Sequence, residues 1–231
     1  MESMDLDQLA GYLSRDAREI GKLANRGVLP GRKVNGEWRF ARSEIHHWLE
    51  SRLHEWSSEE LLSFEGAHPG EVEEPLLGNL LRPESVAVPM PAATRPSVLR
   101  ELLKLAEASF VLYDADAVYA ALIQREEMGT TALPGGVAIP HPHRPQGPGV
   151  LGESLVALGI TSRGIAFGGP RGEMSDVFFL VACTDDRTHL RVLARISRLL
   201  RIEGLVERLR TADSADEARA ILLSAEQGLL S

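Results

Sequence analysis

The chain has 231 residues, a formal net charge of -8 and 44% hydrophobic residues, an ordinary globular composition with room for one large domain or two smaller ones. The negative overall charge argues against bulk attraction to nucleic acids or membranes. The single cysteine, Cys183, lies in an apolar run and excludes a disulfide framework. Because no apolar run reaches the length of a bilayer span and no signal-peptide pattern opens the chain, we expect a cytoplasmic protein.

The first quarter of the chain predicts a small unit with three helices and a hairpin. Apolar residues between positions 6 and 13 are spaced for one face of a first helix. A second helix is predicted from Asp16, which with Glu19 forms a capping pair, to Gly27. Asn35-Gly36 stands between alternating residues and predicts a hairpin over 33–40. A third helix follows, with its apolar face running from Ile45 to Leu53.

The order helix, turn, helix, hairpin, helix resembles the excisionase-type winged-helix DNA-binding domain. The matching positions cover about residues 4–54, and they are Leu13, Ile20, Leu23, Gly27, Leu29-Pro30, Gly36, Trp38-Arg39-Phe40 and Trp48-Leu49. Asp16 and Glu19 depart from the family, which has Ser and Thr at the start of its recognition helix. We therefore expect residues 1–54 to form a winged helix-turn-helix domain.

A local positive charge accompanies this unit. Between positions 15 and 42 there are eight Lys or Arg residues and three Asp or Glu residues, an excess of five. Such an excess on an acidic chain is what a DNA-facing surface needs. The predicted DNA contacts are Arg18 and Lys22 from the second helix, with Lys33 and Arg39 from the hairpin. The alternative is a solvated helix face in a protein-binding module.

Residues 55–75 predict an acidic linker, because Glu, Gly and Pro dominate there. Apolar residues continue at intervals of three or four from Ile45 to Phe64. This spacing predicts that the third helix extends to about Phe64, either as a solvated helix with one apolar side or as a pairing helix.

From residue 76 onward the pattern changes to alternating strands and helices. Strands are expected over 85–89, 155–160 and 177–183, and helices over 96–109, 114–127, 187–200 and 215–226. This alternation predicts a layered α/β domain over residues 76–231.

The run from Gly129 to His141 has the strongest signal for a functional site. Gly135 and Gly136 permit backbone conformations closed to other residues, and Pro140 fixes the backbone before the imidazole. A strand therefore ends in a loop that presents His141. Imidazole is nucleophilic near neutral pH, so His141 is a candidate phosphoryl acceptor. A merely structural histidine at a strand end is the alternative.

Arg125-Glu126, Gly129-Thr130-Thr131 and the segment ending in Ile139-Pro140-His141 together resemble the phosphorylation site of sugar phosphotransferase enzyme IIA domains of the fructose/mannitol/nitrogen-regulatory class. The resemblance covers nearly all of residues 76–231 and implies an enzyme IIA-like α/β fold with a mixed sheet. It also implies that His141 takes a phosphoryl group from an HPr-like phosphocarrier protein.

The same resemblance assigns supporting residues. His189 occupies the family's His-Leu position at a helix start, beside the phosphorylated ring, where the helix N-terminus adds partial positive charge. Arg125 would give bidentate hydrogen bonds to the phosphoryl group, to which Thr130 and Thr131 would donate hydroxyls. We predict that Arg125 and His189 converge on the ring of His141. The alternatives are a salt bridge from Arg125 to an adjacent helix, a helix cap for His189 and ordinary turn roles for the threonines.

Two departures from the family point to a regulatory relative. Pro142 follows the histidine where the family has Gly, and the segment 169–172 replaces the family's Asp-Gly. His141, His143 and His189 also form a weaker candidate set for a transition metal, which we rank below phosphorylation. The absence of a G-x-S-x-G pattern argues against a hydrolase.

The sequence thus predicts a two-domain regulator linked to the phosphotransferase system, with no resident metal and no cofactor. The expected partners are a phosphocarrier and DNA, without a membrane component, and homodimerisation is left open. The alternative function is a non-phosphorylated module that senses an anion, a metal or a protein through the same pocket.

Overall fold

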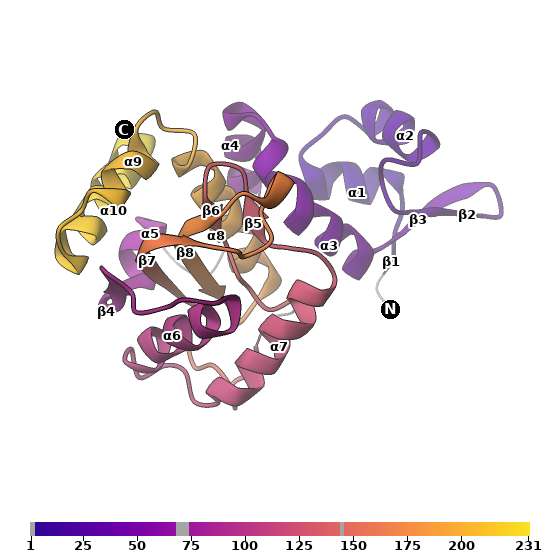
Figure 1. Ribbon diagram of the computed structural model, residues 1–231. Coiled ribbons are helices and arrows are strands. Elements are labelled where there is room, and N and C mark those ends of the chain that lie inside the picture. Colours follow the sequence, from indigo (N-terminus) through magenta and orange to yellow (C-terminus); the bar gives the residue numbers. More distant parts are fainter. Residues whose placement is uncertain (1–2, 68–73, 144–145) are drawn as a thin grey trace.

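The computed structural model describes residues 3–67, 74–143 and 146–231. Part of the predicted acidic linker, residues 68–73, lies outside these ranges. So do residues 144–145 of the loop after His141. Figure 1 shows a small N-terminal unit against one side of a larger α/β unit.

The N-terminal unit contains the predicted helices and hairpin. Its elements are β1 (Ser3–Met4), α1 (Leu6–Leu13), α2 (Ala17–Asn25), β2 (Arg32–Val34), β3 (Glu37–Ala41) and α3 (Arg42–Arg52). Asp16 caps α2 by accepting a hydrogen bond from the backbone N–H of Arg18. Asn35 and Gly36 have φ of 52° and 87°, the positive values that a type I′ hairpin turn requires. The short β1 extends the hairpin into a three-stranded sheet, ordered β1-β3-β2.

The predicted extension of α3 to Phe64 is wrong. Helix α3 ends at Arg52, a 3₁₀ turn η1 covers Leu53–Glu55, and a separate helix α4 covers Ser58–Ala67. The sequence signal for this restart is a capping box. The backbone N–H of Glu60 donates to the Ser57 hydroxyl at 3.2 Å, and that of Ser57 donates to the Glu60 carboxylate at 2.8 Å.

The α/β unit is built on a five-stranded mixed sheet in the order β4-β7-β8-β6-β5. Strand β4 runs parallel to β7, β6 runs parallel to β8, and the remaining neighbours are antiparallel. Its elements are α5 (Leu76–Leu80), β4 (Leu81–Ala87), α6 (Arg95–Glu107), α7 (Ala115–Glu127), β5 (Ala132–Leu133), β6 (Val137–Ala138), β7 (Leu155–Ile165), η2 (Pro170–Gly172), β8 (Ser175–Ala182), α8 (Asp186–Leu199), α9 (Leu205–Arg210) and α10 (Ala215–Leu230).

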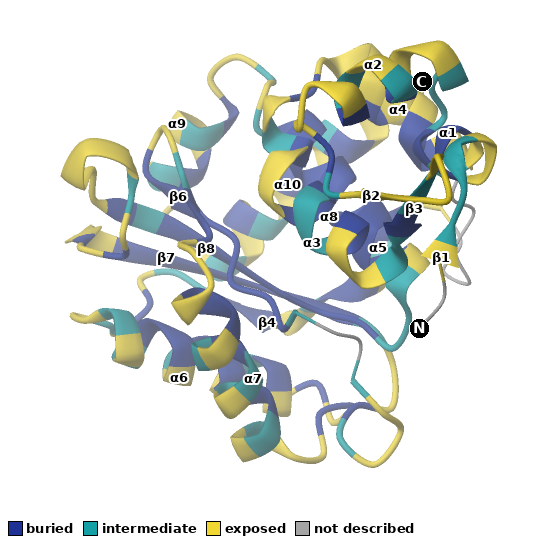
Figure 2. Cartoon of the chain, turned by 90° about the vertical axis from the view of Figure 1, so that its right-hand side faces the viewer, coloured by how far each residue is buried: buried dark blue, intermediate teal, exposed yellow. Residues whose placement is uncertain are grey.

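Helices cover both faces of this sheet. Helices α6 and α7 lie on one face, and α8 and α10 lie on the other (Figures 1 and 2). Side chains alternate along β7: Val156, Leu158 and Ile160 join the core beneath α8, and Leu155 and Ala157 join the core above α6. Burial on both sides explains why the central strands read as continuous apolar runs.

The first strand of the sheet begins earlier than its apolar pattern suggests. It covers Leu81–Ala87 rather than 85–89, and its pairing register with β7 shifts between Leu81 and Val86. Pro83 lies in this irregular stretch, and an edge strand tolerates a residue that lacks a backbone N–H.

The N-terminal unit and the α/β unit share one hydrophobic core. Helix α4, the turn η1 and helix α3 all contact α8. Leu49, Leu53, Leu61 and Phe64 belong to the same buried cluster as Leu193 of α8. Helix α8 is consequently buried from Thr188 to Leu199, although half of its residues are polar.

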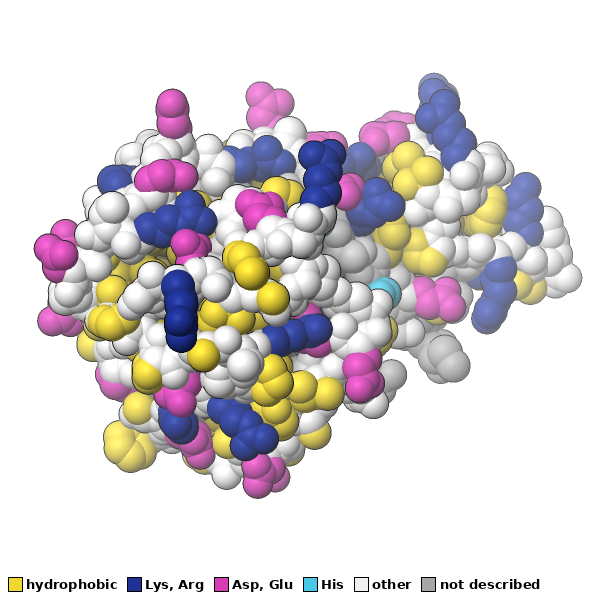
Figure 3. Space-filling model, in the orientation of Figure 1, with side chains coloured by type: hydrophobic (Ala, Val, Ile, Leu, Met, Phe, Trp, Pro, Cys, Tyr) yellow, Lys and Arg dark blue, Asp and Glu magenta, His cyan; other side chains and the backbone are white. Residues whose placement is uncertain are grey.

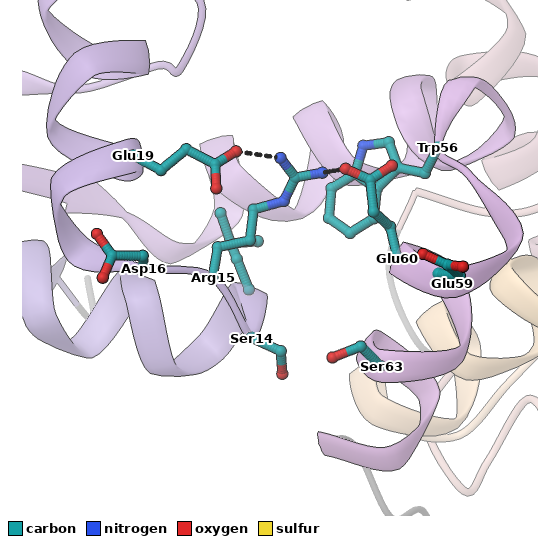
Figure 4. Close-up of a pocket in the computed structure, with 9 residues that line it drawn as sticks. Ser14, Arg15, Asp16, Glu19, Trp56, Glu59, Glu60 and Ser63 are labelled. Atoms are coloured by element: carbon teal, nitrogen blue, oxygen red, sulfur yellow. Dashed lines mark hydrogen bonds and ion pairs between the residues drawn. The ribbon is translucent and has the colours of Figure 1, made fainter.

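A second contact fixes α4 against the helix-turn-helix (Figure 4). Arg15 bridges Glu19 at 2.7 Å and Glu60 at 2.5 Å, and its guanidinium lies 4.4 Å from the ring centroid of Trp56. Arg15 therefore links the helix-turn-helix to α4.

Candidate functional site

His141 lies just after β6 with its imidazole held in one tautomer. Its Nδ1–H donates to the carbonyl of Ile139 at 2.6 Å, which leaves the lone pair on Nε2. The carbonyl of Pro140 accepts the backbone N–H of Val181 at 3.1 Å, which ties this loop to β8. Nε2 accepts a hydrogen bond from Nε of Arg125 at 3.2 Å. The nucleophilic nitrogen therefore points at a guanidinium.

The structure brings together the two residues that sequence analysis predicted to converge on this ring. Arg125 comes from the last turn of α7, and its Nη1 also donates to the carbonyl of Gly129 at 2.9 Å. His189 comes from the first turn of α8, which Asp185 caps through the N–H of Thr188 at 2.8 Å. The ring centroids of His141 and His189 are 5.1 Å apart. A phosphoryl group on Nε2 would thus meet a guanidinium, a second imidazole and a helix N-terminus.

The two threonines line the same pocket, but their hydroxyls are engaged elsewhere. The Thr131 hydroxyl donates to the carboxylate of Glu126, and the Thr130 hydroxyl donates to the carbonyl of Phe167 at 3.4 Å. In this state neither hydroxyl proton is available to a phosphoryl oxygen.

Glu50, which sequence analysis did not single out, occupies the centre of the site. It projects from α3 of the N-terminal unit, and its side chain is fully buried. One carboxylate oxygen, Oε2, lies 3.5 Å from Nε of Arg125 and 3.9 Å from Nε2 of His141. The other, Oε1, accepts from Nε2 of His189 at 3.1 Å.

Three further imidazoles surround this carboxylate. Nε2 of His46 lies 3.2 Å from Oε1, and Nδ1 of His143 and Nδ1 of His47 lie 3.3 Å and 3.6 Å from Oε2. Within the part of the chain that the structure describes, five histidines therefore converge on one glutamate. Two come from α3 and three from the α/β unit.

The electrostatics of this cluster favour an ionised carboxylate among imidazoles. Burial alone would raise the pKa of Glu50, but the surrounding histidines outweigh burial and hold that pKa far below its usual range. Burial lowers the pKa of His189 to about 4, because the contact with Glu50 offsets the desolvation only in part. His189 is consequently neutral at neutral pH.

The N-terminal unit covers the site. His141 and His189 are each only 3% exposed. A cavity of about 90 Å³ remains beside them, lined by residues of both units that include Glu50, Leu53 and His54. A macromolecular donor cannot reach Nε2 of His141 while α3 and η1 stay in this position.

The candidate DNA contacts lie elsewhere, on the N-terminal unit. Arg18 and Lys22 of α2 and Lys33 of β2 are exposed. Arg39 is partly exposed and is paired with Glu37 at 2.9 Å. Figure 3 shows Lys and Arg side chains spread over this end of the molecule rather than gathered into one dense patch.

Cys183 is a buried free thiol at the end of β8, as its apolar surroundings predict. Burial raises its pKa to about 12, so it is an unreactive core residue. Among the described helices, none combines the length and apolar character that a bilayer crossing requires.

Comparisons with known proteins match both units. Residues 79–225 match the family model of the phosphoenolpyruvate-dependent sugar phosphotransferase system, EIIA 2, and residues 3–53 match a helix-turn-helix domain. The chain is 32% identical over 146 residues to a nitrogen regulatory protein of Bradyrhizobium diazoefficiens, covering 62% of this chain and 92% of that protein. It is 29% identical over 141 residues to the fructose-specific EIIA component of Haloferax volcanii, covering 60% and 89%.

A solved structure agrees with these matches. The nitrogen regulatory protein IIA-Ntr from Neisseria meningitidis superposes with a TM-score of 0.57 at 28% identity, covering 64% of this chain and 99% of that one. The predicted enzyme IIA fold and the helix-turn-helix region are thus confirmed. The chain belongs to the EIIA type 2 family of the phosphotransferase system and carries a helix-turn-helix domain before its EIIA domain.

Proposed function

We propose that this protein is a phosphotransferase-linked regulator in which His141 accepts a phosphoryl group and the helix-turn-helix domain responds. The observation that carries this proposal is the environment of Nε2 of His141. A lone pair there faces the Arg125 guanidinium, and the neutral imidazole of His189 lies beside it.

The chemistry is a transfer between imidazoles. The lone pair of His141 Nε2 attacks the phosphorus of a phosphohistidine carrier, the new P–N bond forms, and the donor's P–N bond breaks. The proton on Nδ1 stays in its hydrogen bond to Ile139 throughout. Arg125 and the N-terminus of α8 stabilise the charge on the phosphoryl oxygens, so the step needs no metal.

Glu50 would couple this chemistry to the N-terminal domain. Its carboxylate lies 3.9 Å from the atom that would carry the phosphoryl group, and the two anions would compete for Arg125 and the same imidazoles. Phosphorylation of His141 would therefore expel Glu50 and loosen α3 from α8. The exposed Arg18, Lys22 and Lys33 make DNA the ligand that we propose for the released domain.

The test is phosphorylation of the purified chain by a bacterial phosphocarrier system, with the label mapped by mass spectrometry. We expect one phosphohistidine, at His141, and its complete loss in His141→Ala. His143→Ala is the matched control, because it removes an imidazole two residues away and should retain the label. Label that persists in His141→Ala would refute the assignment.

A further inference from the structure

We propose that the interface between α3 and α8 is a transition-metal site, in which Nε2 of His46, Oε1 of Glu50 and Nε2 of His189 hold one divalent ion such as Zn²⁺. The proposal does not depend on phosphorylation of His141. It goes beyond the metal set expected from sequence, because two of these three ligands come from the helix-turn-helix domain.

The ligand atoms are already spaced for an ion. Oε1 of Glu50 lies 3.2 Å from Nε2 of His46 and 3.1 Å from Nε2 of His189, and the three ligand atoms all lie within 4.8 Å of one another. Ligand atoms of a tetrahedral zinc site, with bonds of about 2.0–2.1 Å, lie about 3.3 Å apart. Two of the three distances between ligand atoms are therefore already close to the value that a tetrahedral zinc site requires.

His46 supplies independent support. Its side chain is 5% exposed, and neither of its nitrogens has a partner in hydrogen-bonding geometry, although Nε2 lies 3.2 Å from Oε1 of Glu50. Each buried polar atom left unpaired costs about 1–3 kcal/mol. An ion on Nε2 would satisfy one of them. Nδ1 lies 3.8 Å from a carboxylate oxygen of Asp186, the type of group that orients a ligating histidine from behind.

The donor chemistry selects the class of ion. Two imidazole nitrogens and one carboxylate oxygen suit Zn²⁺ and neighbouring transition ions, whereas Mg²⁺ and Ca²⁺ favour sites made of oxygen. His189 would ligate through the tautomer with its proton on Nδ1, since a ligating nitrogen must be unprotonated. Three protein ligands leave the fourth position to water.

Such an ion would fasten the two units together. His46 and Glu50 belong to α3, and His189 belongs to α8, so only the closed arrangement offers all three ligands. Ligands that bind one state alone stabilise that state by mass action. Zinc would hence oppose any opening of the interface.

The first experiment is calorimetric titration of the metal-free full chain with Zn²⁺, with the bound metal quantified by elemental analysis. We expect one ion per chain, and at least a tenfold loss of affinity in His46→Ala and in Glu50→Gln. His143→Ala distinguishes this site from the alternative set of His47, Glu50 and His143, whose ligand atoms also lie within 4.8 Å of one another, and it should retain one bound ion. Circular dichroism verifies that each variant is folded, and Glu50→Gln preserves the side-chain volume if His46→Ala does not fold.

Three results would overturn the proposal: no stoichiometric zinc in the wild type, unchanged affinity in His46→Ala, or a loss confined to His143→Ala. A tetrahedral Co²⁺ absorption spectrum that disappears in His46→Ala would give spectroscopic support.

Failure of this proposal is distinguishable from failure of the proposed function. Zinc binding is measured without any phosphoryl donor, and His141→Ala removes the acceptor while retaining all three ligands. Where labelling of His141 occurs, Zn²⁺ should slow it in the wild type and not in His46→Ala. Equal slowing in both would show that the ion acts elsewhere and would count against the site.

Discussion

A carboxylate and a phosphoryl group make similar demands on a site, because both are anions that accept hydrogen bonds from guanidinium and imidazole groups. Glu50 meets these demands in the closed structure. Its oxygens contact Arg125 and His189, the two residues that would serve a phosphoryl group on His141. We interpret Glu50 as an internal stand-in for that group.

Glu50→Gln should accelerate labelling of His141 by about tenfold, the effect of about 1.4 kcal/mol lost from the closed state. The amide has nearly the same volume but no charge to attract Arg125. Initial rates of phosphoryl incorporation, measured by quench and mass spectrometry, test this expectation. Glu44→Gln, on an exposed part of the same helix, is the control and should react like the wild type. A slower rate in Glu50→Gln would contradict a covering role.

Arg125→Ala should slow labelling of His141 by about 100-fold, the usual cost of removing one preorganised charge-stabilising donor. The rate of incorporation at a saturating phosphocarrier concentration is the measurement, with circular dichroism as the check on folding. Arg100→Ala removes an exposed guanidinium of α6 and should leave the rate unchanged. A wild-type rate in Arg125→Ala would show that this side chain does not contribute to phosphoryl transfer.

At the scale of elements, helix α8 joins the two halves of the molecule. Its buried arginines Arg195 and Arg198 form ion pairs with α4 and α10. Arg195 contacts Glu65 of α4 at 2.8 Å and Glu226 of α10 at 2.7 Å, and Arg198 contacts Glu65 at 2.9 Å. Because these groups are buried, removing one partner leaves uncompensated charge in the interface.

Glu65→Ala should therefore lower the free energy of unfolding by about 3 kcal/mol. The substitution leaves the buried guanidinium of Arg198 without its carboxylate partner and removes one of the ion pairs of Arg195. Urea unfolding followed by circular dichroism is the measurement. Glu59→Ala, on the exposed side of α4, should change stability by less than about 0.5 kcal/mol. Equal effects in the two variants would mean that α4 is not held by this ion-pair network.

Helix α2 should provide phosphate contacts if the helix-turn-helix domain binds DNA. Arg18→Ala and Lys22→Ala should each reduce the log–log salt slope of DNA binding by about one unit. Binding of the phosphorylated chain to duplex DNA over a series of salt concentrations measures this slope. Arg163→Ala removes an exposed charge near the end of β7 and should not alter it. Unchanged slopes in both α2 variants would favour a protein-interaction module.

At the scale of the whole molecule, the covered site and the surface of α2 and the hairpin lie on different parts of the N-terminal unit. Helices α3 and α4 face α8, while Arg18, Lys22 and Lys33 remain exposed. A signal at His141 can hence reach the surface of α2 and the hairpin only by moving the N-terminal unit as a body or by changing what surrounds it.

Phosphorylation of His141 should increase hydrogen–deuterium exchange in α3, η1 and α4 by at least tenfold, while the central strands β7 and β8 stay protected. The reason is that these three elements lose their contacts with α8 when Glu50 is expelled. Mass-spectrometric exchange on wild type and His141→Ala, each treated with the phosphocarrier system, makes the comparison. Identical exchange before and after phosphorylation would show that phosphorylation of His141 does not loosen the interface between the two units.

Features that depend on neighbouring residues could be predicted from the amino-acid sequence. Asn35-Gly36 specified the hairpin, since few other residues adopt two positive φ angles in succession. The segment ending in Pro140-His141 indicated the candidate acceptor, because proline and glycine restrict the backbone locally. The family motifs also indicated Arg125 and His189, which the structure places beside His141.

Tertiary structure alone decided what covers this site. Glu50 is one of two glutamates on α3, and no periodicity distinguishes a carboxylate that faces solvent from one that faces five imidazoles. No local pattern marks Arg195 and Arg198 of α8 as buried either, yet they are buried and pair with Glu65 of α4. The physical reason is that docking of the two units depends on complementary charge and shape over residues more than 100 positions apart, which no local pattern contains.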